Sequence, residues 1–334
     1  MNPSSLCRRS VPAIVLVAGL TACAGQTTGG AGFTPQLSAP AAPAAQPDNR
    51  RRSVEIFTAN RDGGSVLGFG VKASGDVAPA VTIAGSKTML LDPDSLAMDD
   101  KGDIYAADDS GTHVAVFAKD ANGNVKPDRT IGGAKTQLGF VEGLFVDPSG
   151  YLWASDFENN LVTGYAPGAR GNVAPAYAIG GSNTQLDDPV GMAMNGAGQL
   201  YVANVHGASI TIYAKNASGN VAPVATIQGG NTALHSPFSI AFDSQGRLLV
   251  ANEGGNVLVF AKGATGNVAP VQSISGVAEG TGVMADSQDH IWVADFTGNS
   301  IKEFASNANG NATPLRTIAG SKTTLNGANY LVEN

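Results

Sequence analysis

Cysteine and clustered basic residues are scarce in this chain of 334 residues. It has two cysteines, and the first, Cys7, lies in a leader-like segment, so we expect no disulfide within one mature chain. Asp and Glu number 27 against 20 Lys and Arg, which gives a formal net charge of −7. Nucleic-acid phosphates require clustered Lys and Arg. The composition therefore indicates no nucleic-acid partner.

Helical periodicity and known catalytic motifs are also missing. Beyond the N-terminus no stretch shows the spacing of apolar residues that a helix requires. No Gly-x-Ser-x-Gly elbow, His-Glu-x-x-His pair, phosphate loop or dinucleotide fingerprint occurs. Aromatic residues make up 6% and there are 43 glycines, which suits many tight turns. The chain is predicted to be all-β.

One pattern of about 48 residues recurs along the chain. Its landmark is Gly-(Asn/Asp)-(Val/Ala)-x-Pro, which begins at Gly75, Gly123, Gly171, Gly219, Gly266 and Gly310. Within one repeat we expect four strands at 238–242, 248–252, 256–260 and 270–274, with a tight turn at 243–246. Four antiparallel strands at this period are typical of a propeller blade.

The repeats begin and end in the middle of a blade. Residues 54–60 match the second strand, and 65–70 match the third. At the other end, 329–332 match the innermost strand. The sequence therefore predicts a six-bladed β-propeller over 53–334, closed by one composite blade from both termini, which removes an exposed sheet edge. The inner strands are expected to start near Asp94, Glu142, Val190, Phe238, Thr281 and Asn329.

The second strands carry a shared motif, seen as Tyr105-Ala-Ala-Asp108, Tyr201-Val-Ala-Asn204 and Trp292-Val-Ala-Asp295. With the repeat period, it makes the chain resemble the NHL-repeat family of six-bladed propellers. That resemblance covers about 280 residues and implies the fold. It leaves the activity open, because such propellers include binding proteins, lyases and metal-dependent lactonases.

The N-terminus has the pattern of an export signal. Arg8-Arg9 precede an apolar run over 11–20, and Leu20-Thr-Ala-Cys23 resembles the lipobox of bacterial lipoproteins. The resemblance implies cleavage after residue 22 and lipidation of Cys23; an ordinary signal with an incidental cysteine is the alternative. Residues 23–52 are polar and are expected to form a disordered tether. By the same resemblance, Ala24 stands where lipoproteins kept in the inner membrane often carry Asp, which implies the outer membrane, so we expect a lipid-anchored protein of the cell envelope.

Polar residues are expected to surround one end of the central channel. The second strands end at Asn60, Asp108, Asp156, Asn204, Asn252 and Asp295, on the side where the inner strands start with Asp94, Glu142 and Asn329. Converging oxygens suit Ca²⁺ or a similar divalent cation. The candidate ligands are Asp94, Glu142, Asp156 and Asn204. The alternative is that the recurring Asp or Asn bonds the backbone of its own turn.

Two histidines, His206 and His235, fall in loops on this same side, at the same and the next blade junction. Either is a candidate general base beside a metal-polarised substrate, or an exposed loop residue.

Two functions follow from these observations. The first is a monomeric binding or scaffold module for a protein, peptide or glycan. The alternative is a metal-dependent lactonase- or lyase-type enzyme with its site at the channel mouth. The sequence leaves open whether the protein is an enzyme.

Overall fold

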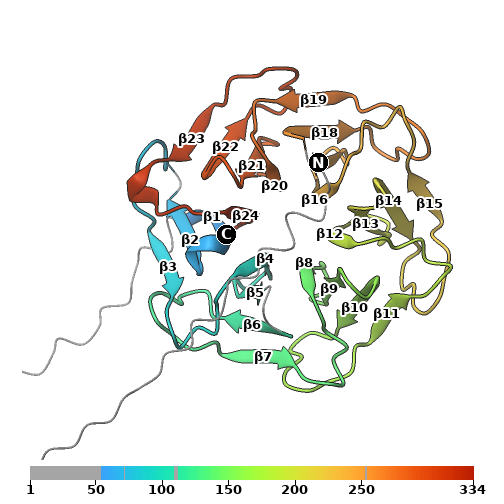
Figure 1. Cartoon of the computed structure of the whole chain (residues 1–334), viewed down its shortest axis with the longest axis horizontal. Helices are drawn as coiled ribbons and strands as arrows, with labels where there is room; N and C mark the ends of the chain where they lie inside the picture. The colour runs from blue at the N-terminus through green and yellow to red at the C-terminus, as the bar shows by residue number, and fades with distance from the viewer. Residues whose placement is uncertain (1–53, 71, 109–111, 253) are drawn as a thin grey trace, which may run out of the picture. The chain divides into compact units, whose positions relative to one another are not determined.

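A computed structural model describes residues 54–70, 72–108, 112–252 and 254–334. The leader, Cys23 and the tether lie outside these residues. Six four-stranded antiparallel sheets are arranged as blades in a ring (Figure 1). The predicted class, an all-β six-bladed propeller, is confirmed. None of the described helical turns is long and apolar enough to cross a membrane.

Each blade contributes one strand to each of four concentric positions. The inner strands are β24 (Ala328–Glu333), β4 (Pro93–Met98), β8 (Val141–Val146), β12 (Pro189–Met194), β16 (Pro237–Phe242) and β20 (Gly280–Ala285). The second strands are β1 (Val54–Asn60), β5 (Ile104–Asp108), β9 (Leu152–Asp156), β13 (Leu200–Asn204), β17 (Leu248–Asn252) and β21 (Ile291–Asp295).

The outer half of each blade follows the same order. The third strands are β2 (Ser65–Gly70), β6 (His113–Phe117), β10 (Leu161–Tyr165), β14 (Ser209–Tyr213), β18 (Asn256–Phe260) and β22 (Ser300–Phe304). The outer strands are β3 (Val81–Ala84), β7 (Arg129–Gly132), β11 (Tyr177–Gly180), β15 (Ala225–Ile227), β19 (Gln272–Ser275) and β23 (Arg316–Ala319). Two 3₁₀ turns, η3 (Arg61–Gly63) and η4 (Ser321–Thr323), lie in connections.

The ring closes as the sequence predicts. β24, from the C-terminus, pairs antiparallel with β1, from the N-terminus, so the sheet order is β24-β1-β2-β3. The second strands are buried throughout β5, β9, β13, β17 and β21, because sheets pack against both of their faces. Side chains on both faces of these second strands are therefore mostly apolar, which explains why their sequences are nearly continuous apolar runs.

The landmark motif covers the outer edge of the neighbouring blade. Gly219 forms a parallel bridge with Ile179 of β11, and the same bridge recurs at all six junctions. Gly219 has φ +84°, a conformation that glycine adopts without strain. The expectation that Pro270 begins an outer strand is wrong: β19 starts at Gln272, because the segment from Gly266 lies along the preceding blade instead. The outer edges are thereby protected from pairing with other chains.

Candidate functional site

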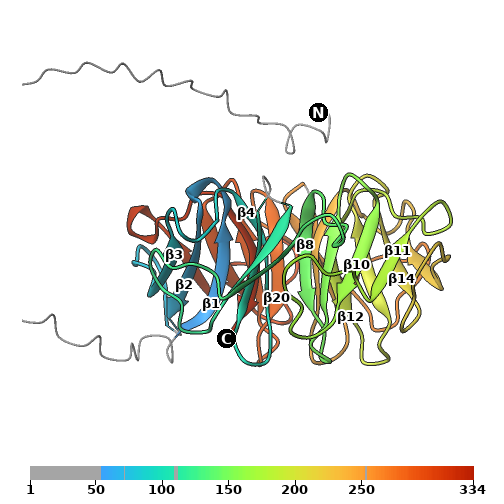
Figure 2. The same ribbon diagram turned by 90° about the horizontal axis from the view of Figure 1, so that it is seen from below.

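The positions predicted to surround a channel mouth meet at one end of the ring. Inner strands start beside the ends of second strands, as in the pairs Pro189–Asn204 and Gly280–Asp295. Figure 2 shows the ring from its edge, with the strands running between its two ends. We call this end, where inner strands start, the closed face, and the other end the open face.

Buried side chains fill the axis at the closed face. Asp94 and Glu142 are 1% and 3% exposed. Tyr330 of β24 belongs to one buried cluster with Val190 of β12, which lies across the ring (Figure 1), and Phe238 packs against that cluster. The cluster therefore crosses the axis and closes the channel at this end.

Tyr330 departs from its repeat. At the third position of the other inner strands stand Ser95, Gly143, Gly191, Ser239 and Gly282. A Cβ on Gly143 would lie 1.9 Å from the carbonyl oxygen of Val190, so the adjacent inner strands pack too closely for a larger residue there. Tyr330 is accommodated with φ +38°, beside a register shift in the β1–β24 pairing. Local backbone strain of this kind is often found at functional positions.

The residues that end the second strands bond the connection that enters their own blade. Asn204 Oδ1 accepts a hydrogen bond from the Asp187 amide (3.1 Å), and Asn252 Oδ1 accepts one from the His235 amide (2.7 Å). The same arrangement is found in three other blades, at Asn60, Asp108 and Asp295. Asp156 is the exception, because its carboxylate accepts hydrogen bonds from Asn159 instead. These contacts give the set a structural role, but the backbone that they bond is that of the connection before the inner strand; the expected bond to the residue's own turn is found at Asp156.

Asp94 and Glu142 are placed differently. Asp94 Oδ1 accepts a hydrogen bond from Asn329 Nδ2 (2.9 Å) and pairs with Arg61 Nε (3.2 Å). Asp94 Oδ2 is buried without a hydrogen-bond partner among the described residues. Burial, followed by the charges of Asp94 and Glu142, raises the pKa of Tyr330 well above its ordinary value. The two carboxylates thus act on one hydroxyl across adjacent blades, and their role as metal ligands stays a prediction.

The two candidate histidines lie in exposed connections on the closed face. His206 is 70% exposed, with Nδ1 3.7 Å from carboxylate oxygens of both Asp187 and Asp188. Burial, then the charge of Asp187, raises the pKa of Asp188 despite the opposing effect of His206. His235 is exposed, and its backbone amide bonds Asn252. Their catalytic role stays a prediction.

The open face contains a cavity that the sequence reading missed. Its volume is about 690 Å³, and every inner strand contributes to its wall. The fourth residue of each inner strand forms an apolar ring made of Leu96, Leu144, Met192, Ile240, Val283 and Leu331. Tyr330 also lines the cavity. We call this space the axial cavity.

Methionine distinguishes the wall of this cavity. Four of the six methionines in the chain line it: Met98, Met192, Met194 and Met284. Near its opening are the carboxylates of Asp99, Asp100 and Glu333, together with Lys101. The concentration of methionine at the inner strands was readable in the sequence. Its convergence on one space was not, because that requires the closed ring.

Comparison with solved structures supports the fold. A putative 6-phosphogluconolactonase from Bacteroides uniformis is 14% identical, with a TM-score of 0.57 over 84% of this chain and 99% of that one. A protein of unknown function from Bacteroides caccae is 11% identical, with a TM-score of 0.58 over 84% and 98%. Virginiamycin B lyase from Staphylococcus aureus is 14% identical, with a TM-score of 0.48 over 67% and 69%.

The two Bacteroides structures, with TM-scores above 0.5 and identities of 14% and 11%, support the propeller fold alone. No protein-family model matches the chain, and a search of curated proteins found no similar sequence. Membership of the NHL-repeat family therefore stays an expectation from the second-strand motif.

Proposed function

We propose that this propeller is a binding module whose ligand occupies the axial cavity. The observation that carries the proposal is a space of about 690 Å³ that all six inner strands line, with four methionines in its wall. Small-ligand sites are typically concave, mostly apolar and about 300–1,000 Å³ in volume. Methionine is flexible and polarisable, and it suits surfaces that accept apolar groups of varied shape.

Among protein, peptide and glycan partners, the cavity favours a peptide. Its wall combines apolar side chains with polar atoms, so it can pack against a large side chain and bond a peptide backbone. Asp99, Asp100 and Glu333 near the opening outnumber Lys101 and favour positive charge on the ligand. The proposed ligand is therefore a peptide segment with an apolar side chain flanked by Lys or Arg.

Fluorescence titration with Nile red, a neutral apolar dye, tests the cavity. We expect saturable binding to the whole protein and at least a tenfold loss of affinity in Met194→Glu, because a carboxylate in the wall opposes apolar ligands. Short peptides with a central Leu flanked by Lys should displace the dye. The same peptides flanked by Glu should displace it much less.

Val224→Glu is the matched control. Val224 is an exposed apolar residue outside the axial cavity, so this variant should bind the dye like the original protein. An equal loss of Nile red affinity in Met194→Glu and Val224→Glu, or no saturable binding of the dye to the original protein, would contradict the proposed function.

A metal-dependent lactonase- or lyase-type activity at the closed face is the second candidate. It is favoured by Asp94 Oδ2, a buried carboxylate oxygen near Glu142 and Tyr330 that has no hydrogen-bond partner in the described part of the chain. Asp156 and Asn204 fit this role less well, since their side-chain oxygens accept hydrogen bonds from Asn159 and Asp187. The fold shared with a putative 6-phosphogluconolactonase is compatible with this candidate. Metal binding that is lost in Asp94→Ala with Glu142→Ala would support it.

The binding module is further proposed to be anchored to the cell envelope, with the outer membrane favoured, through a lipidated Cys23. This part depends on the lipobox-like Leu20-Thr-Ala-Cys23, outside the described residues. Intact mass spectrometry of the protein extracted from membranes tests it. An unmodified N-terminus would contradict the anchor and leave the proposal for the cavity unchanged.

A further inference from the structure

Three ligand-type side chains converge on the open face, in the blade β20–β23. Asp286 follows β20, His290 precedes β21, and Glu303 lies on β22. His290 Nδ1 is 2.9 Å from Glu303 Oε1 and 3.3 Å from Asp286 Oδ2. Among the described residues, this is the one group of three or more His, Cys, Asp or Glu side chains whose ligand atoms all lie within 4.8 Å of one another.

The fold does not require a carboxylate at position 303. Glu303 pairs with Trp292 across β21 and β22. The corresponding partners of Tyr105, Trp153, Tyr201 and Leu249 in the other four intact blades are Val116, Gly164, Ile212 and Val259. Glu303 is only 2% exposed, and burying a charged group is costly unless it is paired. The departure from the repeat therefore needs an explanation beyond packing.

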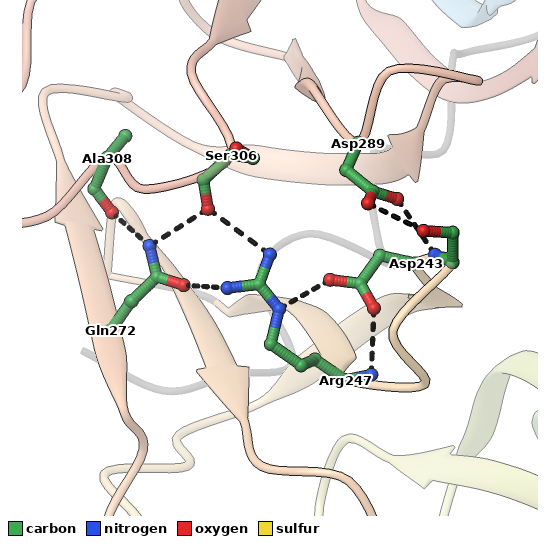
Figure 3. A network of polar contacts seen from close by, with 7 residues as sticks. Asp243, Arg247, Gln272, Asp289, Ser306 and Ala308 are labelled. Atoms are coloured by element: carbon green, nitrogen blue, oxygen red, sulfur yellow. Dashed lines mark hydrogen bonds and ion pairs between the residues drawn. The ribbon is translucent and has the colours of Figure 1, made fainter.

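The neighbouring blade, β16–β19, has no carboxylate at the position of Glu303 and shows a different arrangement around the position of His290. There Arg247 takes the position of His290, pairs with Asp243 and bonds Gln272, and so supplies the cation (Figure 3). In the blade β20–β23 Arg316 pairs with Glu303. Asp286 and Glu303 both face His290 Nδ1, at the place where the neighbouring blade has the Arg247 guanidinium, so a bound cation can take the place of that guanidinium.

We infer that Asp286 Oδ2, His290 Nδ1 and Glu303 Oε1 form a site for a divalent transition-metal ion, with Zn²⁺ the expected one. Ligand bonds of about 2.0–2.2 Å place neighbouring ligand atoms roughly 3 Å apart, as His290 and the two carboxylates already are. One imidazole nitrogen with carboxylate oxygens suits Zn²⁺ better than Ca²⁺, which takes oxygen ligands.

The outer contacts orient these ligands. Trp292 Nε1 donates to Asp286 Oδ2 (3.0 Å), and the amides of Gln288 and His290 donate to Oδ1 (both 2.9 Å). Arg316 Nε donates to the other oxygen of Glu303. Such hydrogen bonds to ligating carboxylates are typical of metal sites. His290 is 27% exposed, which leaves room for water at the remaining coordination positions.

The test is calorimetric titration of the full chain with ZnCl₂ after removal of metals with a chelator. We expect binding of one ion and a rise in melting temperature by mass action. His290→Ala should lower the affinity by more than about 100-fold, since changes to second-shell partners alone cost 10–100-fold. Glu303→Gln should also weaken binding, and circular dichroism checks that both variants fold.

His206→Ala is the matched control, because His206 also has two carboxylates beside it, but at 3.7 Å and in an exposed connection. It should bind Zn²⁺ like the original protein. No binding at millimolar Zn²⁺, or undiminished binding in both His290→Ala and Glu303→Gln, would overturn the inference. Nile red binding to the axial cavity is a separate readout, so either proposal can fail alone.

Discussion

At the scale of single residues, most polar side chains of the repeat satisfy the backbone. In the connection that begins Ile-x-Gly, Thr184 Oγ1 donates to the Gly181 carbonyl (2.7 Å) and accepts from the Leu186 amide (3.4 Å). The same role recurs in four other connections, at Thr88, Thr136, Thr232 and Thr323. The Tyr213 hydroxyl donates to the Thr184 carbonyl (2.6 Å), and no local sequence pattern indicates this bond, because it requires the strand and the connection to be folded together. Burial raises the pKa of Tyr213 to about 12.

The ion pair of Asp295 and Lys302 gives a pH-dependent prediction. Burial acts to raise the pKa of Asp295, but hydrogen bonds from Lys302 and from the amides of Glu279 and Ala278 outweigh it and lower the pKa. A carboxylate whose pKa is lowered by folding stabilises the folded state at pH values above its ordinary pKa. This stabilisation is lost as the pH falls through the pKa of the folded state. Lys302→Met leaves the buried carboxylate unpaired, so it should cost about 3 kcal/mol at neutral pH.

The difference in unfolding free energy between the original protein and Lys302→Met should therefore shrink as the pH falls below the ordinary Asp pKa of about 3.9, because Asp295 is protonated in the unfolded chain before it is protonated in the folded protein. Urea unfolding at several pH values measures it, with Lys262→Met, at an exposed lysine, as the control. A gap that stays constant down to pH 2 would contradict this account.

At the scale of elements, strand positions follow the period of the sequence. β1, β2, β17 and β18 have the predicted bounds, because alternation and turn residues mark them locally. The start of β19 differs from the predicted one, because the residues before it lie along the edge of the preceding blade. That contact is between blades, and no local pattern indicates it.

β24 gives a prediction at this scale. Deleting residues 328–334 leaves β1 as an unpaired edge and removes the buried Tyr330 and Leu331. The loss of these two side chains alone should cost about 5 kcal/mol or more, and the exposed edge should promote association. Thermal unfolding and size-exclusion chromatography measure both effects.

A control lacking only the exposed Asn334 should remain monodisperse with a nearly unchanged melting temperature. An intact melting transition without β24 would show that the ring does not depend on this closure.

At the scale of the whole molecule, the two ends of the axis differ. The closed face holds the ionisable residues that the sequence singled out, Asp94 and Glu142, in a buried environment beside Tyr330. The open face holds the axial cavity. All six blades repeat one plan, so the difference arises from the few positions where a blade departs from it. The proposed metal site at Glu303 depends on a departure of the same kind.

The sequence by itself determined the all-β class, the number of blades and the composite closure, because these follow from period, alternation and turn chemistry, which are local properties. It also marked the polar positions at the ends of the second strands. Only the tertiary structure decided that these positions bond connections, that Tyr330 helps to close one end, and that methionines from separate repeats line one cavity. Those outcomes depend on which side chains meet across the axis and between blades, and residues far apart in the chain meet there only once the ring has closed.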